Sequence, residues 1–354
     1  MQISIVDLYS FTRKQLKHIY LYCEPFIFKF IRIITYYMMS EITSSDRLFE
    51  ALNLQRHLSQ EENPHKEANN SQLFKAGRGP KINFKTVYGG ELMAQALVAA
   101  QATVEKNRKC SSLHCYFHLP SSTEKENIYQ VTKIRDGRTF SHRWSRVIDA
   151  HVNDPYKKSI VFQLDCSFRS LDSNEGEKYT SEMPKVSPPE DCPPYMKFIA
   201  ENPDIPEHVK LFVTYLSKTA PFEFRFERPR RALGLEFNET GISNVWVRLY
   251  KSHQPDAEKI LNEYKEAILC YISDLFLLHA ANRGGAKLAT VLSLNHTMWF
   301  HNSHIPLSFD DWLLFHVKTE NINGGIALVS GVIYQKDGTI LANMVQQGIM
   351  KSAE

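Results

Sequence analysis

One long run of the chain is apolar or small at nearly every position, a second carries an apolar stripe at helical spacing, and each adjoins segments in which apolar and polar residues alternate. The first run, GELMAQALVAAQATV, begins at Gly90 and predicts a helix that is buried on all sides. The alternation that follows predicts strands at 113–119, 127–135, 138–149 and 159–169. The second run predicts a helix over 257–281, and its strands lie at 222–228, 290–301 and 311–319. The chain therefore presents one order of elements twice.

A constant spacing of 183 residues supports a duplication. Three pairs of short motifs recur at this spacing in matching contexts: Phe117-His118 with Phe300-His301, Asn153-Asp154 with Lys336-Asp337, and Phe162-Gln163 with Val345-Gln346. Each half then predicts an α+β unit in which antiparallel strands wrap one long helix. We expect two such units in tandem.

We divide the 354 residues into four parts. Residues 1–71 form an N-terminal extension that we expect to be flexible or dispensable. The first unit spans 72–170, and the second, which carries the candidate catalytic residues, spans 221–354. The linker between them covers 171–220. Seven of the chain's 16 prolines fall between Pro184 and Pro206, so we expect little regular structure there.

The N-terminal extension contains an unusual segment, 15–39, that is rich in Phe, Ile and Tyr. Four charged residues and the central Pro25 interrupt it, which argues against a transmembrane helix, and no small-residue cleavage site marks a signal peptide. Three interpretations remain: a membrane-surface helix, an organellar presequence, or an upstream extension without a role. We favour the third, with a functional chain that starts at Met38 or Met39.

Composition excludes several classes of protein. Apolar residues make up 43% and charged residues 23%, so the chain is neither disordered nor fibrous. The net charge of +3 is too small to indicate a nucleic-acid partner. The six cysteines form no C-x-x-C pair and no zinc-ligand spacing, and we expect reduced, mostly buried thiols inside a cell.

Two polar residues interrupt apolar faces. Asp274 lies on the helical stripe that also contains Ala267, Tyr271 and Leu278. A carboxylate buried there is either a hydrogen-bonded structural group or a general base whose pKa burial has raised. Gln346 shares a strand face with Met344 and other apolar residues, so its amide needs a partner, and a structural and a functional role are equally compatible with this pattern.

The strand LSLNHTMWFH carries a polar row on one face. Period-two alternation places Ser293, Asn295 and Thr297 on that face, whereas His296 lies on the other with Leu292 and Met298. Such a row is ordinarily a solvated face. The chain contains no G-x-S-x-G nucleophile elbow and no H-E-x-x-H metal motif, and we expect no metal site.

Two sets of motifs resemble type II acyl-CoA thioesterases of the peroxisomal animal and bacterial type. In the first half these are Val87-Tyr88-Gly89-Gly90-Glu91-Leu92-Met93-Ala94-Gln95-Ala96-Leu97 and Ser112-Leu113-His114-Cys115-Tyr116-Phe117. In the second half they are Tyr271-Ile272-Ser273-Asp274, Ser293-Leu294-Asn295-His296-Thr297-Met298-Trp299-Phe300-His301 and Val345-Gln346-Gln347-Gly348. The resemblance runs in order from about residue 72 to residue 351.

The resemblance implies a double hotdog fold and the hydrolysis of acyl-CoA to fatty acid and free CoA. The family's site consists of an Asp, a Thr or Ser, and a Gln in the second unit, and these match Asp274, Ser293 and Gln346. They would hold and deprotonate a water molecule, with a backbone N–H stabilising the oxyanion, and no metal or redox cofactor is implied. Cationic residues would bind the CoA phosphates; the sequence does not choose among Arg135, Arg138, Arg143 and Arg169.

The chain departs from the family at two positions near these motifs. Asn295 stands where the family usually has Asp, which bears on the level of activity, and Glu91 stands where it usually has Gln. Subtracting 183 from the three site positions gives Glu91, Cys110 and Gln163. Since glutamate is longer than aspartate and a thiol is a poor hydrogen-bonding substitute for a hydroxyl, we interpret these three residues as a decayed site.

Two alternative functions and two further expectations remain at this point. A weakly catalytic acyl-CoA-binding or sensing protein, or an acyl-CoA dehydratase, would use the same scaffold. By resemblance we place the protein in peroxisomes, although its last residues, Lys351-Ser352-Ala353-Glu354, differ from the family's Ser-Lys-Leu address; the cytosol and the mitochondrion are the alternatives. We also expect a homo-oligomer.

Overall fold

A computed structural model describes residues 44–53, 55–56, 71–77, 79, 86–123, 126–148, 160–171, 177, 179–282 and 288–352. All of them belong to one of the two compact units into which the chain divides, Thr43–Glu354. The expectations for segment 15–39, including the start at Met38 or Met39, lie outside the described residues. In the part of the chain that is described, no helix is long and apolar enough to cross a membrane.

The described strands form a single antiparallel sheet of twelve strands in which the two halves of the chain appear in mirrored order. The order is β1-β2-β4-β5-β6-β3 from the first half, then β9-β12-β11-β10-β8-β7 from the second. Their bounds are β1 Gln55–Arg56, β2 Ser71–Lys75, β3 Arg108–Phe117, β4 Ile128–Asp136, β5 Phe140–Ile148, β6 Ile160–Ser170, β7 Phe222–Phe226, β8 Ile242–Leu249, β9 Leu288–Phe300, β10 Leu313–Asn323, β11 Ile326–Gln335 and β12 Ile340–Ser352.

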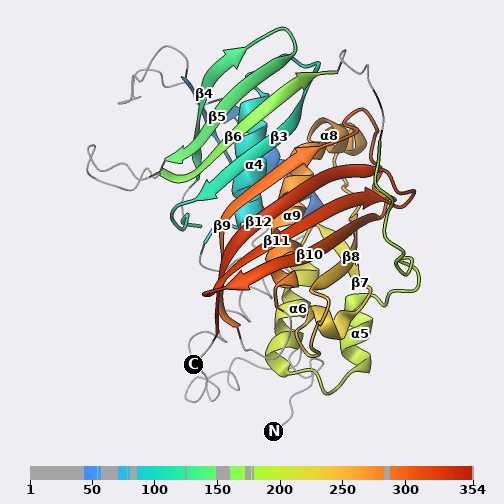
Figure 1. Cartoon of the computed structure of the whole chain (residues 1–354). Coiled ribbons are helices and arrows are strands. Elements are labelled where there is room, and N and C mark those ends of the chain that lie inside the picture. The colour runs from blue at the N-terminus through green and yellow to red at the C-terminus, as the bar shows by residue number, and fades with distance from the viewer. Residues whose placement is uncertain are drawn as a thin grey trace, which may run out of the picture. The chain divides into compact units, whose positions relative to one another are not determined.

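One long helix from each half lies against the same side of this sheet (Figure 1). Helix α4, Gly89–Gln101, is buried from Gly90 to Ala100, as its uninterrupted apolar sequence predicts. Helix α9, Lys265–Ala280, is buried almost throughout and contacts α4. The single helix predicted over 257–281 is two helices, because α8, Ala257–Glu263, ends at Tyr264. The α+β arrangement of two helices wrapped by strands is as expected.

The two halves are related by an approximate two-fold axis. Strands β3 and β9 pair in the centre of the sheet with His114 opposite Thr297, two residues that are 183 apart. The Tyr88 hydroxyl donates to the Tyr271 carbonyl at 2.8 Å, again across 183 residues. Contacts between equivalent residues occur next to a two-fold axis, so both pairs mark its path.

The pairing of the strands shows that the 183-residue spacing does not hold between β6 and β12. A bulge interrupts β3 at Ser111 and β9 at Leu294, which are equivalent at the 183-residue spacing. Next to these bulges Cys110 pairs with Phe168 in the first half, and Ser293 pairs with Gly348 in the second. The spacing between β6 and β12 is therefore 180 residues.

Two segments that we expected to lack regular structure contain helices. In the N-terminal extension, α3, Ser44–Leu52, buries Leu48 and Leu52 in the main core, so this part of 1–71 differs from a flexible extension. In the linker, α5, Tyr195–Glu201, and α6, Glu207–Thr219, are regular. The linker also covers part of the sheet, where Cys192 packs with Trp246 and neighbouring apolar residues. A last short helix, α7, is Pro229–Ala232.

Candidate active site

The three residues matched to the family's site lie together and bond to one another. Gln346 Nε2 donates to Asp274 Oδ1 at 2.6 Å and to Ser293 Oγ at 2.9 Å. Ser293 Oγ donates to Asp274 Oδ1 at 3.1 Å. The amide and the hydroxyl thereby hold the carboxylate in one orientation. We call these three side chains the carboxylate triangle.

A bulge brings Ser293 into the triangle. We expected Ser293 on the face opposite His296, but both side chains contact residues of α9. The extra residue of the bulge, Leu294, restores the inward direction at Ser293, because one added residue reverses the alternation of a strand. Asn295 follows the bulge, and its amide donates to Gln347 at 3.1 Å. Its departure from the family's usual Asp therefore lies beside the triangle and not within it.

Burial and hydrogen bonds act on the Asp274 carboxylate in opposite directions. Its side chain is 5% exposed, and burial raises its pKa above the ordinary aspartate value. Hydrogen bonds from Gln346, Ser293 and the Gly90 backbone N–H oppose this rise because they stabilise the ionised form. The pKa remains raised, as a base requires if it is to accept a proton from water near neutral pH.

The start of helix α4 completes the site from the other half of the chain. A Cβ placed on Gly89 would lie 2.5 Å from Asp274 Oδ2, and one on Gly90 would overlap the Tyr271 carbonyl oxygen. Glycine at these two positions therefore lets the first turn of α4 approach Asp274. The helix dipole adds partial positive charge there, which favours negative charge at the carboxylate and on a bound substrate. Gly89 and Gly90 are part of a motif given in the sequence analysis, but the sequence alone did not assign them to the site.

The corresponding residues of the first half are engaged elsewhere. Glu91 Oε1 accepts a hydrogen bond from the Gly79 N–H at 3.2 Å, and the Cys110 thiol donates to the Ser112 carbonyl at 3.4 Å. Because the chain from β3 to β6 is three residues longer than the chain from β9 to β12, the counterpart of Gln346 is Cys166, and our expectation of Gln163 at this place was wrong. These contacts agree with the interpretation of a decayed site.

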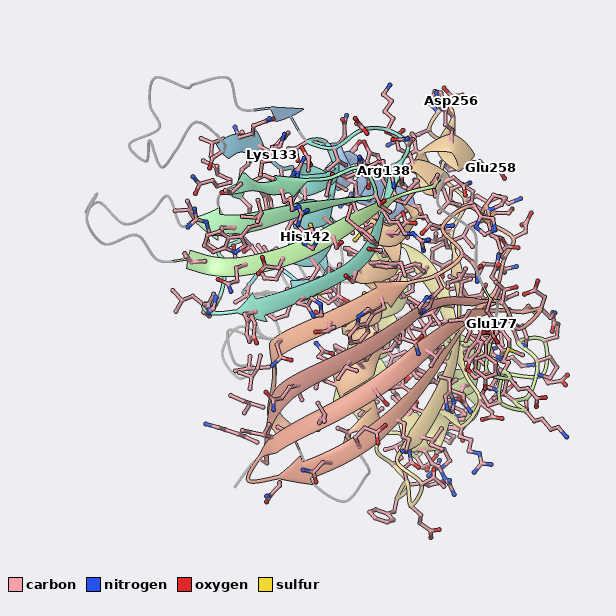
Figure 2. All side chains as sticks on the ribbon, turned by 45° about the horizontal axis from the view of Figure 1, so that its top comes forward. Lys133, Arg138, His142, Glu177, Asp256 and Glu258 are labelled. Atoms are coloured by element: carbon pink, nitrogen blue, oxygen red, sulfur yellow. The ribbon has the colours of Figure 1, made fainter. Side chains whose placement is uncertain are left out.

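Of the four arginines considered for binding the CoA phosphates, Arg143 is buried and Arg138 is exposed. Arg143 is 2% exposed and donates to Thr103 and to Asp136, so it stabilises the first unit internally. Arg138 is exposed at the turn between β4 and β5, where Figure 2 labels it with Lys133 and His142. Within the described ranges, no group of three or more His, Cys, Asp or Glu residues has a geometry that would hold a metal ion.

The cysteines of the described chain are free and buried, as expected. Cys110, Cys115 and Cys270 are each at most 1% exposed, and burial raises the pKa of each thiol well above its ordinary value. Buried, protonated thiols are unreactive. They therefore offer no nucleophile that would compete with a water molecule at Asp274.

Comparisons with known proteins place the chain in one family. The acyl-CoA thioesterase N-terminal domain matches residues 78–162, and the acyl-CoA thioesterase C-terminal domain matches residues 189–350. Acyl-CoA thioesterase 2 of Haemophilus influenzae is 28% identical over 290 residues, which cover 80% of this chain and 93% of that protein. Human acyl-coenzyme A thioesterase 8 is 28% identical over 290 residues, which cover 79% and 84%.

Solved structures share the fold. An acyl-CoA thioesterase II from Mycobacterium marinum has a TM-score of 0.62 at 23% identity and covers 87% of this chain and 99% of its own. A hot dog fold protein from Alicyclobacillus acidocaldarius has a TM-score of 0.61 at 14% identity, with 87% and 98% covered. These likenesses confirm the double hotdog fold. Together with the two domain matches, which follow each other along most of the sequence, they show that the chain belongs to the type II acyl-CoA thioesterase family.

Proposed function

We propose that this protein hydrolyses acyl-CoA thioesters to fatty acid and CoA by direct attack of a water molecule held by the carboxylate triangle. One observation carries the proposal. Gln346 is fully buried and its Nε2 is committed to Asp274 and Ser293, while its Oε1 has no hydrogen-bond partner among the described residues. An acceptor left open beside a carboxylate suits a water molecule, which donates one proton to each.

The reaction follows from this arrangement. The water oxygen attacks the thioester carbonyl carbon as Asp274 accepts one of the water's protons, and Gln346 Oε1 accepts a hydrogen bond from the other. The carbon–sulfur bond then breaks, and the CoA thiolate leaves and takes a proton from Asp274. The carboxylate is thereby regenerated. Ser293 Oγ accepts from Gln346 Nε2 and donates to Asp274 Oδ1, and we give it the role of holding the carboxylate and not that of a nucleophile.

The first N–H groups of α4 are suited to stabilise the oxyanion. The first four N–H groups of a helix lack partners in the preceding turn of the same helix, and the site lies at this end of α4. Because the Gly90 N–H donates to Asp274 and the Glu91 N–H donates to the Tyr88 carbonyl, we assign the oxyanion to the Gly89 N–H. In this proposal one half of the chain supplies the base and the other supplies the helix end.

Release of free thiol from palmitoyl-CoA tests the activity, with Asp274→Asn as the control that removes the base. We expect turnover by the parent protein and nearly none by the variant. Binding of palmitoyl-CoA without thiol release would instead favour a sensing protein, and hydration of an enoyl-CoA would favour a dehydratase. The absence of a burst of thiol in the first turnover, together with residual activity of Ser293→Ala, would distinguish attack by water from an acyl-enzyme.

We further propose a peroxisomal location and a homo-oligomer. A relative in Saccharomyces cerevisiae, 22% identical over 311 residues covering 75% of this chain and 86% of that protein, is named peroxisomal acyl-coenzyme A thioester hydrolase 1. Imaging of the full chain and of a chain starting at Met39 tests the location, and a cytosolic signal from both would refute it. Light scattering at the chain mass of 40.9 kDa would refute the oligomer.

A further inference from the structure

His296 lies beside the carboxylate triangle, and neither the mechanism above nor the sequence motifs give it a role. Its side chain is fully buried, and its Nδ1 lies 3.9 Å from Asp274 Oδ1. On the other side of the ring, Nε2 lies 3.3 Å from Ser273 Oγ. Nδ1 has no hydrogen-bond partner within the described part of the chain. A buried ring nitrogen without a partner destabilises the fold, so its presence next to a carboxyl group calls for an explanation.

The hydrogen bonds of Ser273 assign the tautomer of this ring. Ser273 Oγ donates its only proton to the Cys270 carbonyl at 2.9 Å, so towards His296 it acts as an acceptor. Nε2 of His296 therefore carries the proton and donates it to Ser273. Nδ1 then carries a lone pair, and Asp274 Oδ1 lies 3.9 Å from this atom.

A lone pair in this position distinguishes the two protonation states of Asp274. It repels an ionised carboxylate, whereas a protonated carboxyl group that closes the 3.9 Å separation to hydrogen-bond distance can donate to it. Burial lowers the pKa of His296 to about 3, so the ring is neutral and does not act as a cation beside Asp274. The other titratable groups that act on Asp274 are Tyr88, before α4, and Cys115, on β3; burial raises the pKa of both, so they are neutral as well.

The first half of the chain shows what the fold alone requires at this position. The residue equivalent to His296 at the 183-residue spacing is Leu113, which is fully buried on β3. The equivalent of Ser273 is Gly90. The duplicated unit therefore packs an apolar side chain where the triangle is absent, and it has the His–Ser pair only where the triangle is present.

We propose that His296 is a positioning residue that raises the proton affinity of Asp274, because its Nδ1 accepts a hydrogen bond from the Asp274 carboxyl group after that group has taken a proton from water. This inference rests on the proposed function. It makes Asp274 a stronger base without a cation or a metal, and it gives the buried ring nitrogen a partner at the stage of the reaction at which the carboxyl group is protonated. No covalent bond to His296 forms, and the proton stays on Asp274 until the thiolate takes it.

The test is the pH profile of kcat/KM and of kcat for palmitoyl-CoA in His296→Leu, which introduces the residue of the first half. Thiol release is followed with a dithiodipyridine reagent because it reports thiols at acidic pH. We expect the acidic limb to move down by about one pH unit, the equivalent of one lost hydrogen bond, and kcat at neutral pH to fall about three- to tenfold with KM unchanged. His296→Asn, whose Oδ1 stands close to the position of Nδ1, should restore most of the shift.

Two further variants make the result interpretable. The exposed His301, later on the same segment, is the matched control, and His301→Leu should leave the acidic limb in place. Ser273→Ala frees Nε2, so its effect and that of His296→Leu should not add. A folded His296→Leu protein with an unchanged acidic limb, or one moved upward, overturns the inference. If His296→Leu does not fold, the acidic limb of His296→Asn is compared with that of Ser273→Ala. A parent-like limb in His296→Asn and a lowered limb in Ser273→Ala support the inference, and equal limbs overturn it. Full activity of Asp274→Asn would refute the proposed function itself, which separates the two failures.

Discussion

Replacing Gly89 by alanine tests whether the start of α4 belongs to the site. The added Cβ would lie 2.5 Å from Asp274 Oδ2 and 2.9 Å from Phe117 Cε1, whereas ordinary contacts begin at 3.4 Å. Either the carboxylate or the helix start has to retreat by about 1 Å to relieve this overlap. A displacement of about 1 Å at a reacting group lowers the rate roughly a hundredfold. We therefore expect kcat/KM for palmitoyl-CoA to fall about a hundredfold.

Stability should change much less than activity in this variant. The structure records no positive φ at Gly89, so alanine fits its backbone conformation, and alanine favours a helix by up to about 1 kcal/mol over glycine. Overpacking costs about 1–3 kcal/mol, which offsets that gain. Thermal unfolding followed by circular dichroism should consequently show a small shift.

A matched glycine provides the control. A Cβ on Gly77 would meet the Glu50 carbonyl oxygen at 3.6 Å, an ordinary contact, so Gly77→Ala should keep kcat/KM within about twofold. Parent-like kinetics of Gly89→Ala, in a protein that unfolds at the parent's temperature, would show that Asp274 does not depend on the start of α4. The account of a site shared by the two halves would then be wrong.

Three other predictions address the base, the pH dependence and the N-terminal segment. Asp274→Asn should remove nearly all thiol release, and Glu91→Gln should leave it within a few-fold; two variants that each lose about half would indicate two working sites. Because the pKa of Asp274 is raised and the ionised form is the base, kcat/KM should decline as pH falls through a value above the ordinary aspartate pKa, and a limb at or below the ordinary pKa would contradict the assignment. Leu48→Ala should destabilise the protein by about 2–5 kcal/mol in urea unfolding, since Leu48 is fully buried, whereas an unchanged midpoint would mean that α3 is dispensable.

The sequence indicated Asp274 and Gln346 because each is a polar residue among apolar neighbours, and burial of both agrees with that reading. Ser293 was assigned to the wrong face because a bulge at Leu294 leaves no trace in a period-two pattern. The strand β8 was missed for a related reason. Val245, Trp246 and Val247 are all buried, since α9 covers one face and the linker covers the other, and a strand covered on both faces does not alternate.

The helices of the linker were missed because proline was taken only as a breaker. Pro194 and Pro206 precede the first residues of α5 and α6, where the missing N–H costs nothing. The position of His296 against Asp274 depends on how α9 packs against β9, which no local pattern contains. Subtracting a constant spacing of 183 likewise gave Gln163 as the counterpart of Gln346, because a constant spacing does not allow for the three extra residues between β3 and β6.

The two central helices begin at different places relative to the duplicated site positions, which bears on the interpretation of a decayed site in the first half. At the 183-residue spacing Gly89 and Gly90 correspond to Ile272 and Ser273. Helix α9 begins at Lys265, so Ile272 and Ser273 lie inside it. Their N–H groups therefore donate to carbonyl groups of the preceding turn. Restoring an acid, a hydroxyl and an amide in the first half would therefore still leave no donor for an oxyanion. In the interpretation of a decayed site, the extra turns of α9 remove the helix start that a second centre would need, and Glu91 instead holds the chain at Gly79.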